Sequence, residues 1–253
     1  MKILICMKQV PDTMDVMLAG DYTLEREFVA QIMNLADESA LELGLALRDA
    51  HGGEVTVITM GPERAESMLL EAVSRGADHG VLLTSPAFAG ADTLVTAKCL
   101  TAAAQTLGGF DLILCGRRAT DGETGQVGPM MASMLQIPCV ANATRAMLDK
   151  NKLTIDQLKE DGVITWKASL PALVTLCEWS YRLRLPTIAG MRRAAKSVIA
   201  RLTPPDIGVS RCGIAASPTR VVHLSPHSMG IRPCRKLPVL DVLAALEERE
   251  LLP

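Results

Sequence analysis

Apolar residues along the chain gather in short continuous runs, which are separated by longer stretches of mixed character. Two runs, Lys2–Met7 and Asp111–Cys115, show no alternation of polar and apolar residues, as is typical of central strands covered on both faces. Glu54–Met60, Val81–Leu83 and Leu170–Leu176 are predicted to be strands from their β-branched and aliphatic residues. The chain therefore offers a series of buried strands.

Several of the intervening stretches have the periodicity of amphipathic helices. One begins at Asn34 and continues through Leu47, and the others are Ala65–Ser74 and Leu94–Leu107. Strands that alternate with helices of this length form βαβ units, which build a mainly parallel sheet. We therefore predict an α/β fold, a Rossmann-like sheet with helices on both faces.

Two regions interrupt this alternation. Beyond Pro204 the periodicity fades until a short amphipathic helix is predicted over Val239–Leu252. We expect an α/β domain over residues 1–200 and a C-terminal arm over residues 201–253, because residues 201–253 have too little apolar periodicity to form a hydrophobic core of their own. A small antiparallel insert is also predicted, from three segments joined by polar turns: Cys139–Met147, Lys152–Gln157 and Val163–Ala168.

The loop after Asp111–Cys115 carries the most informative residues. Gly116 leaves the strand, and the glycine-rich stretch Ala119–Pro129 leads into a helix predicted over Met130–Leu135, with Thr124 as its N-cap. In parallel sheets such a loop is where nucleotides bind, because backbone N–H groups and the helix dipole face the anion. An ordinary turn-rich loop is the alternative, since neither common phosphate-binding glycine motif is present.

Composition narrows the classes of function. The 253 residues include 26 basic and 28 acidic ones, so nothing indicates a nucleic-acid partner or an anionic-membrane surface. The seven cysteines form no CxxC pair, which favours a reducing compartment over a disulfide framework or a zinc site. No signal peptide and no apolar run of about 20 residues is found, so a cytoplasmic protein without membrane insertion is expected.

Several motifs together resemble the β subunit of electron transfer flavoproteins. The loop Gly116–Pro129 resembles the nucleotide-binding signature of that family, and Lys8–Thr13 resembles its N-terminal signature. Asn34–Glu42 is similar to a further family motif, in which Leu35 here replaces the usual proline. Leu170–Thr175 resembles a family strand. The resemblance covers roughly residues 1–200.

The resemblance implies a heterodimer with an α subunit that holds its own electron-transferring FAD. It implies electron transfer to or from a flavin dehydrogenase, such as an acyl-CoA dehydrogenase, and an arm that packs on the α subunit. The nucleotide site of such a β subunit holds either a structural AMP or a second FAD, which takes a hydride from NADH and bifurcates the two electrons. Phe88–Thr93 and Asp121–Pro129 resemble the FAD-containing group, so we expect FAD.

The resemblance also implies site residues. The backbone around Gly122–Val127 is expected to bind the diphosphate, and an arginine at position 118, where the family usually has glutamine, would favour a reduced, anionic flavin. Without the resemblance, Asn34 and Asp37 are explained as helix caps, and Asp92 or Thr93 is equally well explained as the cap of the helix that follows. The full expected set is Cys6, Asn34, Leu35, Ala36, Asp37 and Met60 around the adenosine; Asp92, Thr93 and Thr96 around the ADP portion; and Gly116, Arg117, Arg118, Ala119, Thr120, Asp121, Gly122, Glu123, Thr124, Gly125, Gln126 and Val127 in the loop.

A docking surface for the dehydrogenase is expected near the end of the α/β domain. Leu185 precedes a proline, as in the family's exposed docking loop, and a helix predicted over Ala189–Ala200 carries Arg192, Arg193 and Lys196. An aliphatic anchor with a basic rim suits transient binding. The alternative is a solvated basic helix face.

Functions of other classes remain open. An adenine-nucleotide-binding regulatory protein with the same fold would bind AMP or ATP alone and need no partner. A free-standing hydrolase is less favoured, because the four histidines have no metal-ligand spacing and no GxSxG motif is present.

Overall fold

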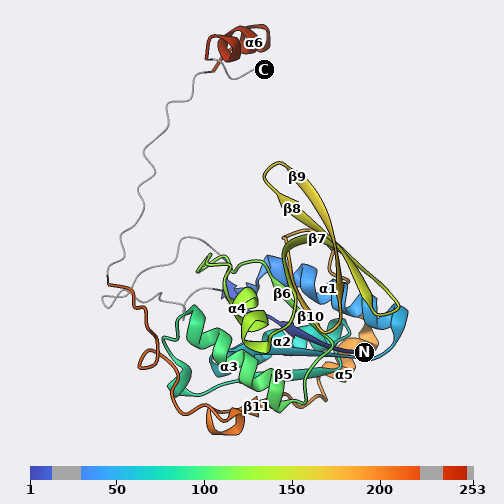
Figure 1. Cartoon of the computed structure of the whole chain (residues 1–253), viewed down its shortest axis with the longest axis vertical. Coiled ribbons are helices and arrows are strands. Elements are labelled where there is room, and N and C mark those ends of the chain that lie inside the picture. The colour runs from blue at the N-terminus through green and yellow to red at the C-terminus, as the bar shows by residue number, and fades with distance from the viewer. Residues whose placement is uncertain (13–29, 223–235, 250–253) are drawn as a thin grey trace. The chain divides into compact units, whose positions relative to one another are not determined.

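The computed structural model of the chain describes residues 1–12, 30–222 and 236–249 (Figure 1). The chain divides into two compact units, residues 1–220 and 221–253. None of the helices in the described residues is long and apolar enough to cross a membrane.

The first unit is built on a nine-stranded sheet. Neighbouring strands from β11 through β7 are parallel, and the last two pairs are antiparallel. The mainly parallel sheet and its antiparallel insert are thus confirmed, and in Figure 1 the insert extends as a long hairpin from the body. The strand order is β11 (Ala200–Leu202), β5 (His79–Leu83), β4 (Glu54–Met60), β1 (Lys2–Cys6), β6 (Leu112–Gly116), β10 (Ala172–Leu176), β7 (Cys139–Asp149), β8 (Lys152–Lys159) and β9 (Gly162–Ser169).

The strand order reverses at β1. Along the chain, β1 is followed outward by β4 and β5, and the chain then returns to place β6 on the other side of β1. β1 and β6 pair in register, with Ile3 opposite Leu112 and Cys6 opposite Cys115. A reversal of this kind opens a crevice at the carboxyl ends of the two strands, which is where open α/β sheets bind ligands.

Helices cover both faces of the sheet, as predicted. One aliphatic core lies against α1 (Leu35–His51), α2 (Glu66–Arg75) and α5 (Ile188–Ala194). The other core lies against α3 (Thr93–Thr106) and α4 (Val127–Leu135). The buried strands, which are mainly aliphatic, supply side chains to both cores, which explains their lack of polar alternation.

Some predicted boundaries are wrong. α4 begins at Val127 instead of Met130, and the residue at its N-cap position is Gln126, so Thr124 does not cap it. α5 ends at Ala194 instead of Ala200, because Ala200 enters β11 and pairs with Val81. A small second sheet was not predicted: β2 (Gln9–Pro11) pairs antiparallel with β3 (Gln31–Met33).

The C-terminal residues fall into both units. Residues 203–220 belong to the first unit, with a single-turn helix at Pro205–Ile207. In the second unit, α6 covers Val239–Glu247, shorter than the predicted Val239–Leu252, whose last residues lie outside the described part of the chain. Val239, Val242 and Leu243 of α6 are exposed. Packing of the arm on an α subunit remains a prediction.

Candidate functional site

The loop at the carboxyl end of β6 lies at the strand-order reversal, and its outer half is exposed. Residues Gly122–Gln126 are exposed, with Glu123 and Gly125 in the left-handed region at φ 48° and 62°. Two backbone bonds shape the turn, from Glu123 N to Ala119 O at 2.8 Å and from Arg117 N to Leu176 O at 2.8 Å. Within the described part of the chain, the backbone N–H groups of Thr124, Gly125 and Gln126 have no hydrogen-bond partner. Three consecutive donors therefore stand free immediately before a helix N-terminus.

The buried carboxylate of Asp37 joins the two strand exits beneath this loop. It accepts hydrogen bonds from Lys8 N at 2.7 Å and from Gly116 N at 2.9 Å. A side chain at position 116 would collide with this carboxylate, which explains the glycine. Burial raises the pKa of Asp37 to about 7, although hydrogen bonds from Lys8, Asn34 and Gly116 act in the opposite direction. Since both oxygens bind backbone, Asp37 positions the loop from below.

The amide of Asn34 holds the next part of the loop. Its Nδ2 donates to Arg118 O at 2.9 Å, and its Oδ1 accepts from Thr120 N at 3.2 Å. Asn34 occupies the N-cap position of α1 without a side-chain capping bond, so the helix-cap explanation is wrong for its side chain. Asn34 and Asp37, at the N-terminus of α1, therefore fix the conformation of the loop through hydrogen bonds to its backbone.

Five charged residues form ion pairs along the edge of the loop. Lys8 Nζ lies 2.6 Å from Asp121 Oδ1, and Glu178 pairs with Arg117 Nε at 2.6 Å and Arg118 Nε at 3.3 Å. Burial opposes ionisation of Glu178, but its own backbone N–H and the two arginines hold its pKa below the usual range. The sequence analysis missed Lys8 and Glu178, each two residues beyond the end of a buried strand. That shared position could have predicted both residues, because the carboxyl ends of parallel strands meet at one edge of the sheet.

The N-terminus of α3 approaches the loop from the side. Asp92 caps α3 by accepting from Val95 N at 3.0 Å, as predicted, and Thr93 Oγ1 donates to Gln126 Oε1 at 3.3 Å. Thr96 lies on the first turn and is partly exposed. The polar edge thus continues from the loop onto α3.

The remaining expected residues lie at the same edge of the sheet. Cys6 ends β1 and is buried, and its thiol donates to Met131 Sδ at 3.9 Å. Met60 ends β4 and is partly exposed, while Leu35 and Ala36 begin α1. The loop is joined by direct contacts to Asn34, Asp37 and Thr93, whereas Cys6 and Met60 are placed there by topology alone.

Leu185 follows a segment that packs along α1, whereas Arg192 and Arg193 lie on α5, which packs against α2. Arg184 bonds to Glu42 through its backbone N at 2.9 Å and also pairs with Asp49 at 2.7 Å. Leu185, at the next position, is 81% exposed. Because these contacts hold Arg184 in place, the neighbouring Leu185 is kept in an exposed position before any partner binds.

Other exposed apolar side chains lie near Leu185 in the sequence. They are Trp179, in the segment after β10, and Ile188 and Met191 of α5, and the sequence analysis did not include them in the docking surface. Arg192 and Lys196 are exposed, while Arg193 donates to Val73 O at 2.8 Å and so binds the end of α2.

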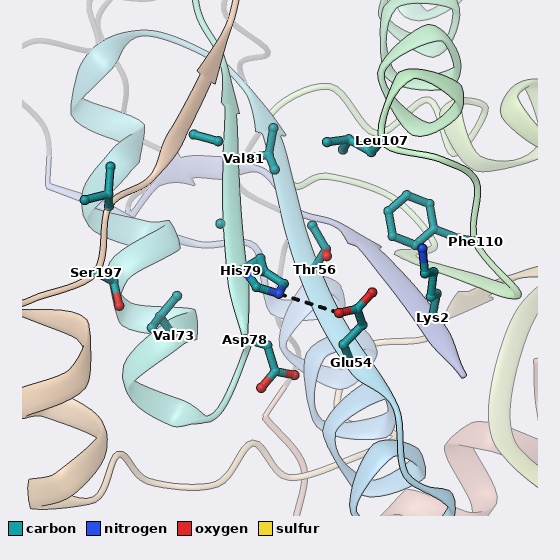
Figure 2. Close-up of a pocket in the computed structure, with 13 residues that line it drawn as sticks. Lys2, Glu54, Thr56, Val73, Asp78, His79, Val81, Leu107, Phe110 and Ser197 are labelled. Carbon is teal, nitrogen blue, oxygen red and sulfur yellow. Dashed lines mark ion pairs between the residues drawn. The ribbon is translucent and has the colours of Figure 1, made fainter.

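A hollow lies at the opposite edge of the sheet, formed by the amino ends of the strands. It has a volume of about 470 Å³ and is lined by Lys2, Glu54, His79 and Ala200, the first residues of their strands (Figure 2). Figure 2 shows the Glu54 carboxylate directed at His79, with Oε2 and Nε2 3.6 Å apart. In the described residues, no group of three or more potential ligands could hold a metal ion here or elsewhere.

Comparison with known proteins identifies relatives over most of the chain. Residues 21–207 match the family model described as Electron transfer flavoprotein domain. The chain is 42% identical over 229 residues to the Electron transfer flavoprotein subunit beta of Thermoanaerobacterium thermosaccharolyticum, covering 89% of this chain and 88% of that protein. It is 40% identical to Protein FixA of Azorhizobium caulinodans, with 87% and 83% covered. It is 39% identical to the Caffeyl-CoA reductase-Etf complex subunit CarD of Acetobacterium woodii, with 91% and 90% covered.

Proposed function

The chain belongs to the electron transfer flavoprotein family as a β-type subunit acting in electron transfer, and from this premise we propose that its loop Arg117–Gln126 binds FAD. The observation that carries the proposal is the row of free N–H groups at Thr124, Gly125 and Gln126, which precedes the N-terminus of α4. Such a row, reinforced by the helix dipole, binds the diphosphate of a dinucleotide.

The side chains around the loop fit this ligand. The side chains of Asn34 and Asp37 form hydrogen bonds with backbone groups in and beside the loop, and so hold the loop in place before any nucleotide binds. Cys6, Met60 and the start of α1 would enclose the adenosine, with Thr93 and Thr96 beside the ADP portion. The contacts of Asp92 favour a positioning role instead of direct contact with the nucleotide.

Two features favour FAD over AMP. First, unpaired N–H donors extend over three consecutive residues. Second, the hydrogen bond between Thr93 and Gln126 extends the polar surface from the loop onto α3, which suits a diphosphate better than the single phosphate of AMP. Bound FAD would supply the redox chemistry, accepting a hydride from NADH and passing its electrons on singly. The protein contributes orientation and charge: Arg117 and Arg118, held by Glu178, lie where an anionic ligand gains from them.

The proposal includes partners. An α subunit carrying its own FAD would complete the protein, covering the exposed apolar side chains of α6. A flavin dehydrogenase, such as an acyl-CoA dehydrogenase, would bind the surface of Trp179, Leu185, Ile188 and Met191, with Arg192 and Lys196 at its rim. The uncombined cysteine thiols suit a cytoplasmic location.

The test is to purify the chain with its α subunit, denature the complex and quantify FAD and AMP per heterodimer. We expect two FAD and no AMP, which would justify an assay of NADH-driven bifurcation. One FAD with one AMP would make this nucleotide structural. Adenine nucleotide without any co-purified flavoprotein partner would instead favour a regulatory protein.

A glycine variant tests the loop itself. Gly125→Ala places a side chain at φ 62°, 3.2 Å from Arg117 O, and is expected to reduce the nucleotide of this subunit to a small fraction. Gly208→Ala is the matched control, because φ is 66° there and a methyl group would meet nothing within 4 Å. Both carry a similar strain of about 1–2 kcal/mol, so equal nucleotide loss in both would contradict the proposed site.

A further inference from the structure

The segment that follows β11 returns across the α3 side of the sheet. Cys212 Sγ donates to Ala87 O at 3.2 Å, and Ile214 N donates to Ala89 O at 2.9 Å. Gly213 lies between them with φ 63°, and a Cβ there would come within 2.8 Å of Ala89 O. The close approach of the two backbones requires glycine, so this return path is built into the sequence.

The segment ends at the N-terminus of α3, where Asp92 receives it. Thr219 donates its backbone N–H and its hydroxyl to Asp92 Oδ2, at 3.1 and 2.8 Å. Asp92 N in turn donates to Ser217 Oγ at 2.9 Å. The other oxygen, Oδ1, keeps the cap on Val95 N. One carboxylate therefore begins the helix and holds the returning chain.

The neighbouring residue connects this contact to the loop. Thr93 follows Asp92 directly and donates to Gln126, the last residue before α4. Thr219 and Gln126 are thus linked through Asp92 and Thr93. The first compact unit ends at Arg220, one residue beyond Thr219. The chain then continues into the second unit, residues 221–253, which is the part of the predicted arm meant by the C-terminal arm from here on.

We propose that Asp92 is a positioning residue that couples the loop Arg117–Gln126 to the point where the C-terminal arm leaves the domain, through Thr219 on one side and Thr93 on the other. Ligand binding at the loop then stabilises one conformation of residues 217–220, where the arm begins. Conversely, holding residues 217–220 in that conformation raises the affinity of the loop for its ligand. The two effects are equal by linkage. The ligand's identity rests on the proposed function, but the coupling between loop and arm does not.

The ionisation of Asp92 agrees with this arrangement. Burial opposes the charge, yet hydrogen bonds from Val95 and Thr219 lower the pKa of its carboxyl group. The charged form that accepts these bonds is therefore present throughout the neutral range.

Hydrogen–deuterium exchange of the full-length chain, purified with its α subunit, tests the coupling. Thr219→Val removes the hydroxyl donor and should speed exchange in peptides covering residues 119–126 by about fivefold, the ratio that one lost hydrogen bond produces. Thr203→Val is the control: Thr203 also donates its N–H and hydroxyl to a single carboxylate oxygen, Asp206 Oδ2, within the same segment. It should leave residues 119–126 unchanged.

A second variant separates the cap from the contact with the arm. In Asp92→Asn the amide oxygen still accepts from Val95 N, while the amide nitrogen cannot accept from Thr219. It should reproduce the exchange pattern of Thr219→Val and keep α3 intact. Loop exchange that matches the Thr203→Val control in both variants would overturn the coupling.

Added FAD distinguishes failure of the coupling from failure of the proposed function. In the unmodified protein, FAD should slow exchange at residues 217–220, and this protection should be lost in Thr219→Val. Absence of FAD binding would refute the proposed function while the ligand-free comparison still decides the coupling. Binding of FAD with no protection of residues 217–220 would refute the coupling alone.

Discussion

The two edges of the parallel sheet, formed by the amino and the carboxyl ends of its strands, both carry charged side chains, yet they differ in how backbone groups are used. At the amino edge, Lys2 N donates to Asp111, Glu54 N to Met1 O and Val55 N to Asp78, so the strand starts are satisfied internally. At the carboxyl edge, Asn34 and Asp37 hold part of the loop so that other N–H groups stand free.

A hollow of about 470 Å³ lies at the amino edge. Its polar groups, such as Glu54 and His79, lie on an open surface where ion pairs contribute little. Recognition of an anionic ligand depends on donors that are fixed and unpaired before it arrives, as the row of N–H groups at Thr124, Gly125 and Gln126 is. The presence of a hollow alone is therefore a poor guide to function in this fold.

The largest difference between the edges should appear on removing one aspartate from each. Asp37→Ala removes a buried carboxylate and leaves the N–H groups of Lys8 and Gly116 without an acceptor, and it should reduce the free energy of unfolding by about 2–5 kcal/mol. Asp78→Ala removes an exposed acceptor of Val55 N, which water can replace in part, and should cost about 1 kcal/mol. Urea denaturation measures both, and equal losses would contradict the comparison.

The pH dependence of stability should also separate Asp37 from other carboxylates. Because its pKa is about 7 in the folded protein against 3.8 ordinarily, the folded state holds the proton more tightly. The contribution of Asp37 to stability therefore falls as pH rises from about 4 to 7.

The urea midpoint at pH 5 and pH 8 measures this effect. Asp37→Asn should reduce the difference between the two midpoints. Asp92→Asn should not, because the pKa of Asp92 is lowered and its contribution is lost only at more acid pH. An unchanged difference in Asp37→Asn would show that another group is responsible.

Exposed aliphatic residues at two places on the surface provide a smaller test. Leu185 follows Arg184, which is bound to α1, whereas Val198 lines the amino-edge hollow and is 91% exposed. Leu185→Ala should raise the KM for a flavin dehydrogenase partner about tenfold, as loss of an interface anchor does. Val198→Ala should leave that KM unchanged, and equal effects would remove the support for a docking surface at Leu185.

The smallest effect is expected inside the hollow itself. Glu54→Gln removes the charge that faces His79, and it should change the free energy of unfolding by less than about 0.5 kcal/mol. Nucleotide content should stay the same. A loss of nucleotide in this variant would mean that the amino edge takes part in binding.

Features that depend on neighbours in the chain were predictable. The helix periodicity and the aliphatic strands are local, and both were confirmed. Of the two residues that could cap α3, Asp92 and Thr93, the structure has Asp92 at the N-cap. The predicted cap at Thr124 failed because the loop keeps Gln126 in the helical region and starts α4 at Val127. The site residues remain predictions, and the structure adds Lys8 and Glu178 to them.

By itself, the sequence determined the α/β class, the order of most elements and the family, because periodicity and motifs are properties of short segments. Only the tertiary structure decided what the polar side chains bind. Asn34 contacts residues 118 and 120, Asp37 contacts residue 116, and Asp92 contacts residue 219. These partners are far apart in sequence, and they meet because parallel strands bring their carboxyl ends, and the loops that follow, to a single edge.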